Sequence, residues 1–164
     1  MVLSVRHSGV ALIGLAALTL SPALARAQDV TGVWLTDDGE AAVEIQPCGD
    51  SRCGRIVWLK DPVDSHGQPL RDANNPNASE RGRPICGVQI LQGVKRQSND
   101  SWDGGSVYDP DEGKTYTVML KRDGEARLLV TGYIGMKAFG ETVVWTRNDS
   151  QKRCTAETKP RATQ

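Results

Sequence analysis

Apolar and polar side chains alternate in short runs through the chain between Val30 and Asn148, and turn residues separate the runs. A period of two is typical of strands, because successive side chains of a strand point to opposite faces of the sheet. Short turns such as Asp37-Asp38-Gly39 and Asp123-Gly124 favour antiparallel pairing of consecutive strands. The pattern predicts eight strands, at residues 31–36, 41–46, 53–59, 85–91, 102–108, 114–121, 126–133 and 141–147.

One face of each predicted strand collects the apolar and aromatic side chains. A meander of eight such strands that closes on itself buries all of these faces together. We therefore expect an all-β fold, an eight-stranded antiparallel up-and-down barrel over residues 28–148. The expected interior positions are Ala41, Val43, Ile45, Ile56, Trp58, Val88, Ile90, Trp102, Gly104, Ser106, Tyr108, Tyr116, Val118, Leu120, Leu128, Val130, Val143, Trp145 and Arg147.

The first and last strands carry related stretches, Gly32-Val33-Trp34 and Trp145-Thr146-Arg147. They resemble the calycin signature of lipocalins and fatty-acid-binding proteins, in which a late arginine covers a tryptophan at the closed end of the barrel. The arrangement is favourable because the arginine cation is attracted to the large π-face of the tryptophan ring. The resemblance implies that the two strands lie side by side, that Gly32, Trp34, Trp145 and Arg147 close the barrel, and that any binding site lies at the other end.

Two segments interrupt the strand pattern. Residues 60–84 are long, polar and rich in turn residues, so we expect either a functional lid or a mobile insertion. After Asn148 the chain is polar, and apart from Cys154 nothing in residues 149–164 predicts packing. We expect a frayed tail there.

Residues 1–27 have the three parts of a secretory signal peptide: basic Arg6, an apolar run from Val10 to Leu20, and the small-x-small site Ala25-Arg26-Ala27. The apolar run is too short to span a bilayer. We expect export to the periplasm or the medium. The remaining chain holds 18 basic and 20 acidic residues, a net charge near −2, which argues against nucleic acid or an anionic membrane as partner.

Four cysteines follow the signal segment, at Cys48, Cys53, Cys86 and Cys154. An even number in an exported chain indicates two disulfides, for which three pairings are possible. Cys48 and Cys53 flank a turn and are suited to clip a hairpin, which leaves Cys86 to hold the tail at Cys154. The spacing fits no zinc pattern, and we expect neither a metal nor a cofactor.

A longer series of motifs is more specific than the Gly-x-Trp stretch. Its members, in chain order, are Cys53-Gly54-Arg55-Ile56-Val57-Trp58-Leu59, Arg83-Pro84-Ile85-Cys86-Gly87, Trp102-Asp103-Gly104-Gly105, Tyr108-Asp109-Pro110, Gly113-Lys114-Thr115-Tyr116, Gly132-Tyr133 and Phe139-Gly140. Together they resemble the bacterial family known as the domain of unknown function 2147, secreted proteins with a lipocalin-like barrel. The resemblance covers about residues 30–147 and implies fold and export, but no catalytic residue.

Catalytic chemistry has little support in the sequence. His66 is the only histidine after the signal segment and lies beside Gly67 in the long polar segment. The acidic group Asp61, Asp64 and Asp72 with Asn74 and Asn75 resembles a hard-cation site, but Asp and Asn also serve ordinary turns. We expect binding rather than catalysis.

Two functions remain open. The first is a non-catalytic exported protein that holds a small apolar or amphipathic ligand in the barrel, contacted by Trp58, Trp102, Tyr108, Tyr116 and Val118. The second is a cell-envelope interaction module with a filled barrel, which engages a protein or glycan partner through residues 60–84. The sequence identifies neither the ligand nor the oligomeric state.

Overall fold

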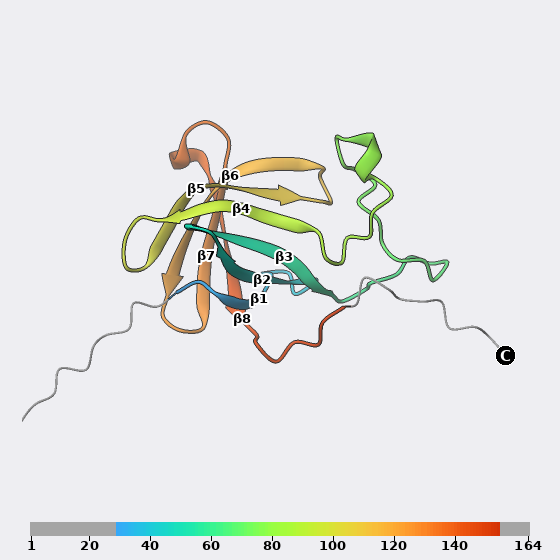
Figure 1. Ribbon diagram of the computed structural model, residues 1–164, viewed down its shortest axis with the longest axis horizontal. Coiled ribbons are helices and arrows are strands. Elements are labelled where there is room, and N and C mark those ends of the chain that lie inside the picture. Colours follow the sequence, from blue (N-terminus) through green and yellow to red (C-terminus); the bar gives the residue numbers. More distant parts are fainter. Residues whose placement is uncertain (1–28, 155–164) are drawn as a thin grey trace, which may run out of the picture.

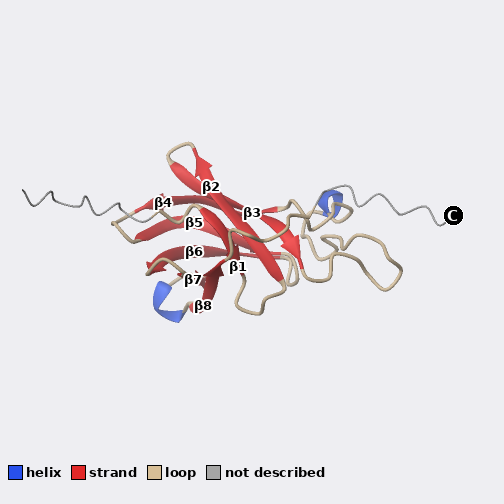
Figure 2. Cartoon of the chain, turned by 90° about the horizontal axis from the view of Figure 1, so that it is seen from below, coloured by secondary structure: helices blue, strands red, loops and turns tan. Residues whose placement is uncertain are grey.

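The computed structural model describes residues 29–154 and forms one closed antiparallel barrel whose strands are neighbours in chain order (Figure 1). The strands are β1 (Gly32–Leu35), β2 (Ala41–Cys48), β3 (Ser51–Leu59), β4 (Gln89–Arg96), β5 (Ser101–Asp109), β6 (Lys114–Asp123), β7 (Arg127–Tyr133) and β8 (Glu141–Arg147). Two single-turn helices, η1 (Ala78–Glu80) and η2 (Lys137–Phe139), lie outside the strands (Figure 2). The predicted fold class is confirmed, whereas the predicted signal peptide lies outside the described residues.

The seam of the barrel joins the two stretches that the sequence singled out. Trp34 of β1 pairs with Arg147 of β8, and Leu35 pairs with Thr146. The pairing is short, because β1 itself has only four residues. The expectation that the first and last strands lie side by side is therefore confirmed.

Trp34 fills one end of the barrel. Its side chain is fully buried, and its indole Nε1 donates a hydrogen bond of 2.8 Å to the carbonyl of Val30. The Arg147 guanidinium lies 5.2 Å from the ring centroid, as the calycin resemblance implied. Gly32 has φ of +134°, and a Cβ there would lie 2.5 Å from Arg147 Nη2, so the glycine makes room for the arginine.

A second arginine, Arg122 of β6, also lies over Trp34, at 4.9 Å from the ring centroid. It is only 6% exposed. Its guanidinium donates hydrogen bonds to the carbonyls of Gly124 (3.0 Å), Glu125 (3.0 Å) and Asp29 (3.3 Å). Burial and the nearby Arg147 charge lower the pKa of Arg122, but an arginine stays protonated at physiological pH. Arg122 therefore ties the β6–β7 turn and the N-terminal segment to the closed end.

The predictions for the third and fourth strands need correction. The fourth strand was expected at residues 85–91 but runs from Gln89 to Arg96, because residues 85–88 turn back toward β3 through Gly87, whose φ is +92°. Trp58 was expected inside the barrel. A bulge between β2 and β3 pairs Ala42 with Trp58 and Val43 with Ile56, and the extra residue moves Trp58 to the outer face.

The described part of the expected tail is packed rather than frayed. Asp149 accepts a hydrogen bond from the Val33 amide, Arg153 pairs with Glu44, and the Cys154 amide donates to the carbonyl of Val57. Residues 149–154 thus contact β1, β2 and β3 in turn. The same three strands carry a small apolar cluster of Val33, Ala42, Val57, Leu35 and Trp58 outside the main core. Residues 155–164 lie outside the described part.

Both disulfides pair as expected, Cys48 with Cys53 across the β2–β3 hairpin and Cys86 with Cys154. The second bridge joins the end of the long β3–β4 loop to the C-terminal segment, and its cysteines are 68 positions apart in the sequence. No helix within residues 29–154 is long and apolar enough to cross a membrane.

Arg122→Met should lower the free energy of unfolding by about 2–4 kcal/mol, because it leaves three backbone carbonyls without their donor and removes the cation from Trp34. The matched control is Arg127→Met, which removes an exposed arginine that pairs with Asp123 and should cost less than about 1 kcal/mol. Urea unfolding followed by tryptophan fluorescence measures both. Equal losses in the two variants would show that Arg122 does not hold the closed end.

Candidate functional site

The barrel interior divides into a solid half and a hollow half. Around Trp34 the core is packed by side chains that are fully buried and do not line the cavity described next: Val30, Ile45, Leu91, Val94, Trp102, Val118, Leu120 and Leu128. Toward the other end lies a cavity of about 530 Å³. This volume is in the range of natural sites for small molecules.

Apolar side chains from six strands and from the long β3–β4 loop line the deep part of the cavity. They are Ala41, Val43, Ile56, Leu59, Leu70, Ile85, Ile90, Val107, Val130, Val143 and Trp145. Trp145 is 5% exposed and pairs with Leu128 of the solid half, so it forms part of the cavity floor. Strand alternation predicted the inward direction of Val43, Ile56, Ile90, Val130 and Val143. It did not predict Val107. A register shift between Trp102 and Gly105 changes which side chains of β5 point inward, so Val107 lines the cavity, whereas Gly104 and Ser106, which were expected inside, do not.

The five side chains that the sequence suggested as ligand contacts do not lie together. Tyr108 and Tyr116 line the cavity. Trp102 and Val118 lie in the solid half, where Arg96 covers Trp102 at 5.1 Å from the ring centroid. Trp58 lies on the outer face. Of the five expected contacts, the structure therefore places Tyr108 and Tyr116 at this cavity, and it places Trp58, Trp102 and Val118 elsewhere.

The β3–β4 loop, residues 60–88, covers part of the open end and is held by a buried carboxylate. Asp72 is fully buried and accepts hydrogen bonds from the Tyr108 hydroxyl (2.6 Å) and from Asn75 Nδ2 (2.7 Å). Arg83 Nη2 lies 2.8 Å from the same carboxylate. Tyr108 belongs to β5, so this contact fixes the loop to the barrel wall.

These contacts set the protonation of both partners. Burial raises the pKa of the Asp72 carboxyl, but the hydrogen bonds from Tyr108, Asn75 and Arg83 outweigh it, so the pKa is lowered overall. Burial and the hydrogen bond to Asp72 raise the pKa of Tyr108 to about 12. At neutral pH the carboxylate is charged and the phenol is neutral, as these hydrogen bonds require. We call the contacts of Asp72 with Tyr108, Asn75 and Arg83 the Asp72 clasp.

A second contact joins the loop to the β5–β6 turn. Asn74 Nδ2 donates a hydrogen bond of 2.7 Å to the carbonyl of Asp111. Gly113 packs so closely on the loop that a Cβ there would lie 1.9 Å from the Asn74 carbonyl oxygen, and its φ is +66°. Residues 60–84 were expected to be either a functional lid or a mobile insertion. Because these contacts fix the segment over the open end, its position is closer to that of a lid.

The rim of the cavity is acidic. Its lining includes eight carboxylates and no Lys, Arg or His. They are Asp37, Asp38, Glu40, Asp61, Asp109, Asp111, Glu112 and Glu141. The sequence did not indicate that these residues lie together. The closed topology brings the β1–β2, β3–β4, β5–β6 and β7–β8 connections to one end.

The candidate catalytic residues of the sequence do not meet in the cavity. His66 is exposed and does not line the cavity. Asp64 accepts hydrogen bonds from the backbone amides of His66 and Gln68, so it stabilises a turn. The Asp72 carboxylate already accepts the hydrogen bonds that hold the loop to the barrel. Within residues 29–154 no group of three or more His, Cys, Asp or Glu side chains is placed to hold a metal ion.

Comparisons with known proteins agree with this architecture. The model of the family described as "Uncharacterized protein conserved in bacteria (DUF2147)" matches residues 32–147. Protein HP1028 from Helicobacter pylori, described as belonging to the lipocalin family, is similar in structure, with a TM-score of 0.66 and 24% sequence identity over 74% of this chain and 84% of that chain. At this identity the similarity shows the fold alone. No curated protein sequence matches significantly.

Asp72→Asn should lower the free energy of unfolding at neutral pH by about 2–4 kcal/mol, because Arg83 loses its buried partner and an amide donor faces other donors. Glu80→Gln removes the other, exposed carboxylate that pairs with Arg83 and should cost less than about 1 kcal/mol.

The same pair of variants predicts a pH effect. Because the folded pKa of Asp72 lies below the ordinary value of 3.8, its stabilising contribution is present above that value and declines as the pH falls toward the folded pKa. The difference in unfolding free energy between wild type and Asp72→Asn should therefore shrink on acidification below about pH 4. Chemical unfolding over a pH series measures it, and a difference that stays constant or grows would contradict the clasp.

Proposed function

We propose that this chain, which belongs to the DUF2147 family of uncharacterized proteins conserved in bacteria, is an exported binding protein that holds a small apolar or amphipathic ligand. The barrel cavity would receive the ligand, and no chemical step is involved. The cavity of about 530 Å³, lined in its depth by aliphatic side chains, carries this proposal. An eight-stranded barrel is just wide enough either to be filled by its own side chains or to hold one small ligand.

The distribution of packing supports binding at one end only. The fully buried side chains around Trp34 leave no room for a ligand at the closed end, whereas Val43, Ile56 and Ile90 face open space. Transfer of an apolar molecule from water to such a surface is favourable by roughly 25 cal/mol per Å² of apolar area removed from water. Tyr108 and Tyr116 add aromatic walls near the mouth.

Export rests on separate observations. The sequence begins with the three parts of a signal peptide, and all four cysteines are joined in disulfides. Such bonds form and persist in oxidising compartments. A periplasmic or secreted location fits both observations.

The alternative, an interaction module that uses residues 60–84 to engage a partner, assumed a filled barrel. The cavity is not filled, and the loop contributes Leu70 to its wall while Asp72 fixes the loop to β5. A loop with these contacts forms part of the cavity wall and is not a separate surface for a partner. We therefore favour ligand binding.

Ile90→Trp should weaken binding of the uncharged fluorescent probe N-phenyl-1-naphthylamine by at least about tenfold, because the indole fills space that the probe would occupy. Ile134→Trp is the matched control, since Ile134 is 73% exposed in the β7–β8 connection. Fluorescence titration measures affinity, and circular dichroism checks the fold. Failure of the wild type to bind, or undiminished binding by a folded Ile90→Trp protein, would contradict the proposal.

A further inference from the structure

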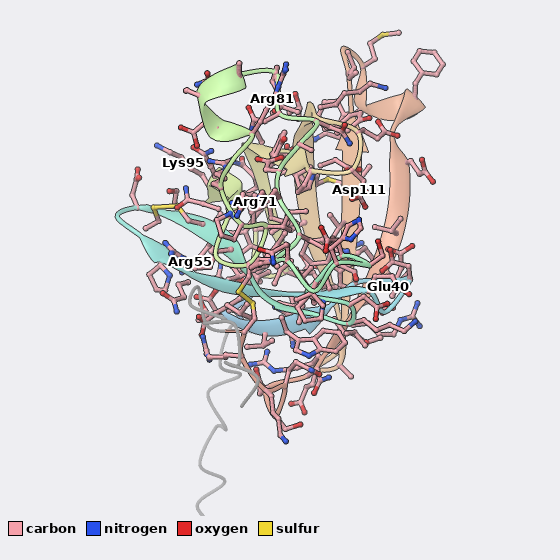
Figure 3. All side chains as sticks on the ribbon, turned by 90° about the vertical axis from the view of Figure 1, so that its right-hand side faces the viewer. Glu40, Arg55, Arg71, Arg81, Lys95 and Asp111 are labelled. Carbon is pink, nitrogen blue, oxygen red and sulfur yellow. A yellow bond between two sulfur atoms is a disulfide. The ribbon has the colours of Figure 1, made fainter. Side chains whose placement is uncertain are left out.

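The cavity mouth carries far more negative charge than the chain as a whole. Eight carboxylates line it, whereas the chain from residue 28 onward has a net charge near −2. They come from the β1–β2 turn, the β3–β4 loop, the end of β5 with the β5–β6 turn, and the start of β8. Figure 3, which looks at the side that carries the long loop, shows Glu40 and Asp111 on this same side.

Few cations neutralise these carboxylates. Lys60 pairs with Glu40 at 2.7 Å, and Lys114 pairs with Glu112 at 3.2 Å. Neither lysine lines the cavity. Within residues 29–154 the other six form no salt bridge. They are Asp37, Asp38, Asp61, Asp109, Asp111 and Glu141.

Two groups at the rim, Asp111 and Tyr116, have raised pKa values to which neighbouring carboxylates contribute, whereas local hydrogen bonds and a nearby lysine lower the pKa values of Asp38 and Glu112. Partial burial and the charges of Asp109 and Asp38 raise the pKa of Asp111. The hydrogen bond to Glu112, partial burial and the charges of Glu112, Asp109 and Glu141 raise the pKa of Tyr116 to about 12. A cation placed among the rim carboxylates would relieve the part of these shifts that comes from neighbouring negative charge.

The depth and the mouth of the cavity therefore suit chemically different groups of one ligand. The aliphatic depth accepts an apolar body and offers no charged partner, since Tyr108 already donates its hydroxyl proton to Asp72. The rim repels an anionic headgroup and attracts a cationic one, and a cleft with low-dielectric walls concentrates this field. We propose that the cavity selects amphipathic cations, molecules with an aliphatic or aromatic body and an amine or quaternary ammonium group that lies among the rim carboxylates.

This inference rests on the proposed function, because it assigns a ligand class to the same cavity. It is tested with three probes that share a decyl chain: decyltrimethylammonium, the uncharged decyldimethylamine N-oxide, and decanoate. Isothermal titration calorimetry, below micellar concentrations, at low ionic strength and mildly alkaline pH, measures their affinities. We expect the cation to bind roughly tenfold more tightly than the N-oxide, decanoate to bind most weakly, and added salt to reduce the difference.

A matched pair of double variants locates the effect. Asp111→Asn with Glu141→Gln removes two rim charges whose side chains form no salt bridge in the described structure. Asp100→Asn with Glu125→Gln removes the same formal charge from the β4–β5 and β6–β7 turns at the closed end. The rim variant should lose most of the preference for the cation while its affinity for the N-oxide stays within about twofold. The closed-end variant should behave as the wild type does.

The outcomes separate the two proposals. Equal binding of the three probes, or tightest binding of decanoate, overturns the cation inference and leaves ligand binding intact. A preference for the cation that falls equally in both double variants also overturns it, because the effect would then come from overall charge. No binding of any probe overturns both the inference and the proposed function.

Discussion

The contact of the buried Trp34 ring with the guanidiniums of Arg122 and Arg147 is the constraint on which the rest of the barrel depends. Trp34 belongs to the shortest strand, and β1 meets β8 through only two residue pairs. The two guanidiniums lie 4.9 and 5.2 Å from its ring centroid. Arg147 comes from the strand across the seam, and Arg122 reaches from β6 to three backbone carbonyls. Closure is therefore held by side chains as much as by strand pairing.

A firmly closed end allows the other end to be hollow. An unfilled cavity forfeits the dispersion contacts that close packing supplies, so the hollow half needs support from elsewhere. The structure supplies it from outside the strands: the Asp72 clasp fixes the loop to β5, Asn74 joins it to the β5–β6 turn, and the Cys86–Cys154 bridge joins it to the C-terminal segment. Packing stabilises one end, and polar contacts with a covalent bond stabilise the other.

Periodicity and turn chemistry were sufficient to predict the barrel, its seam and the inward positions of Val43, Ile56, Ile90, Val130 and Val143. They could not predict how far along the barrel axis each side chain lies, so Trp102 and Val118 were assigned to a ligand site although they lie in the solid half. A single bulge moved Trp58 outside. Arg122, the Asp72 clasp and the acidic rim arise from contacts between residues distant in sequence, for which local pattern carries no signal.

The central claim, a ligand site confined to one half of the barrel, is tested most directly by methyl-labelled nuclear magnetic resonance during titration with decyltrimethylammonium. The account predicts saturable shifts at Ile56, Ile90, Val130 and Val143, which line the cavity, and little change at Val94, Leu120 and Leu128 around the closed end. Shifts centred on the closed half or on the outer cluster at Val33 and Val57, or no saturable shift at all, would contradict it.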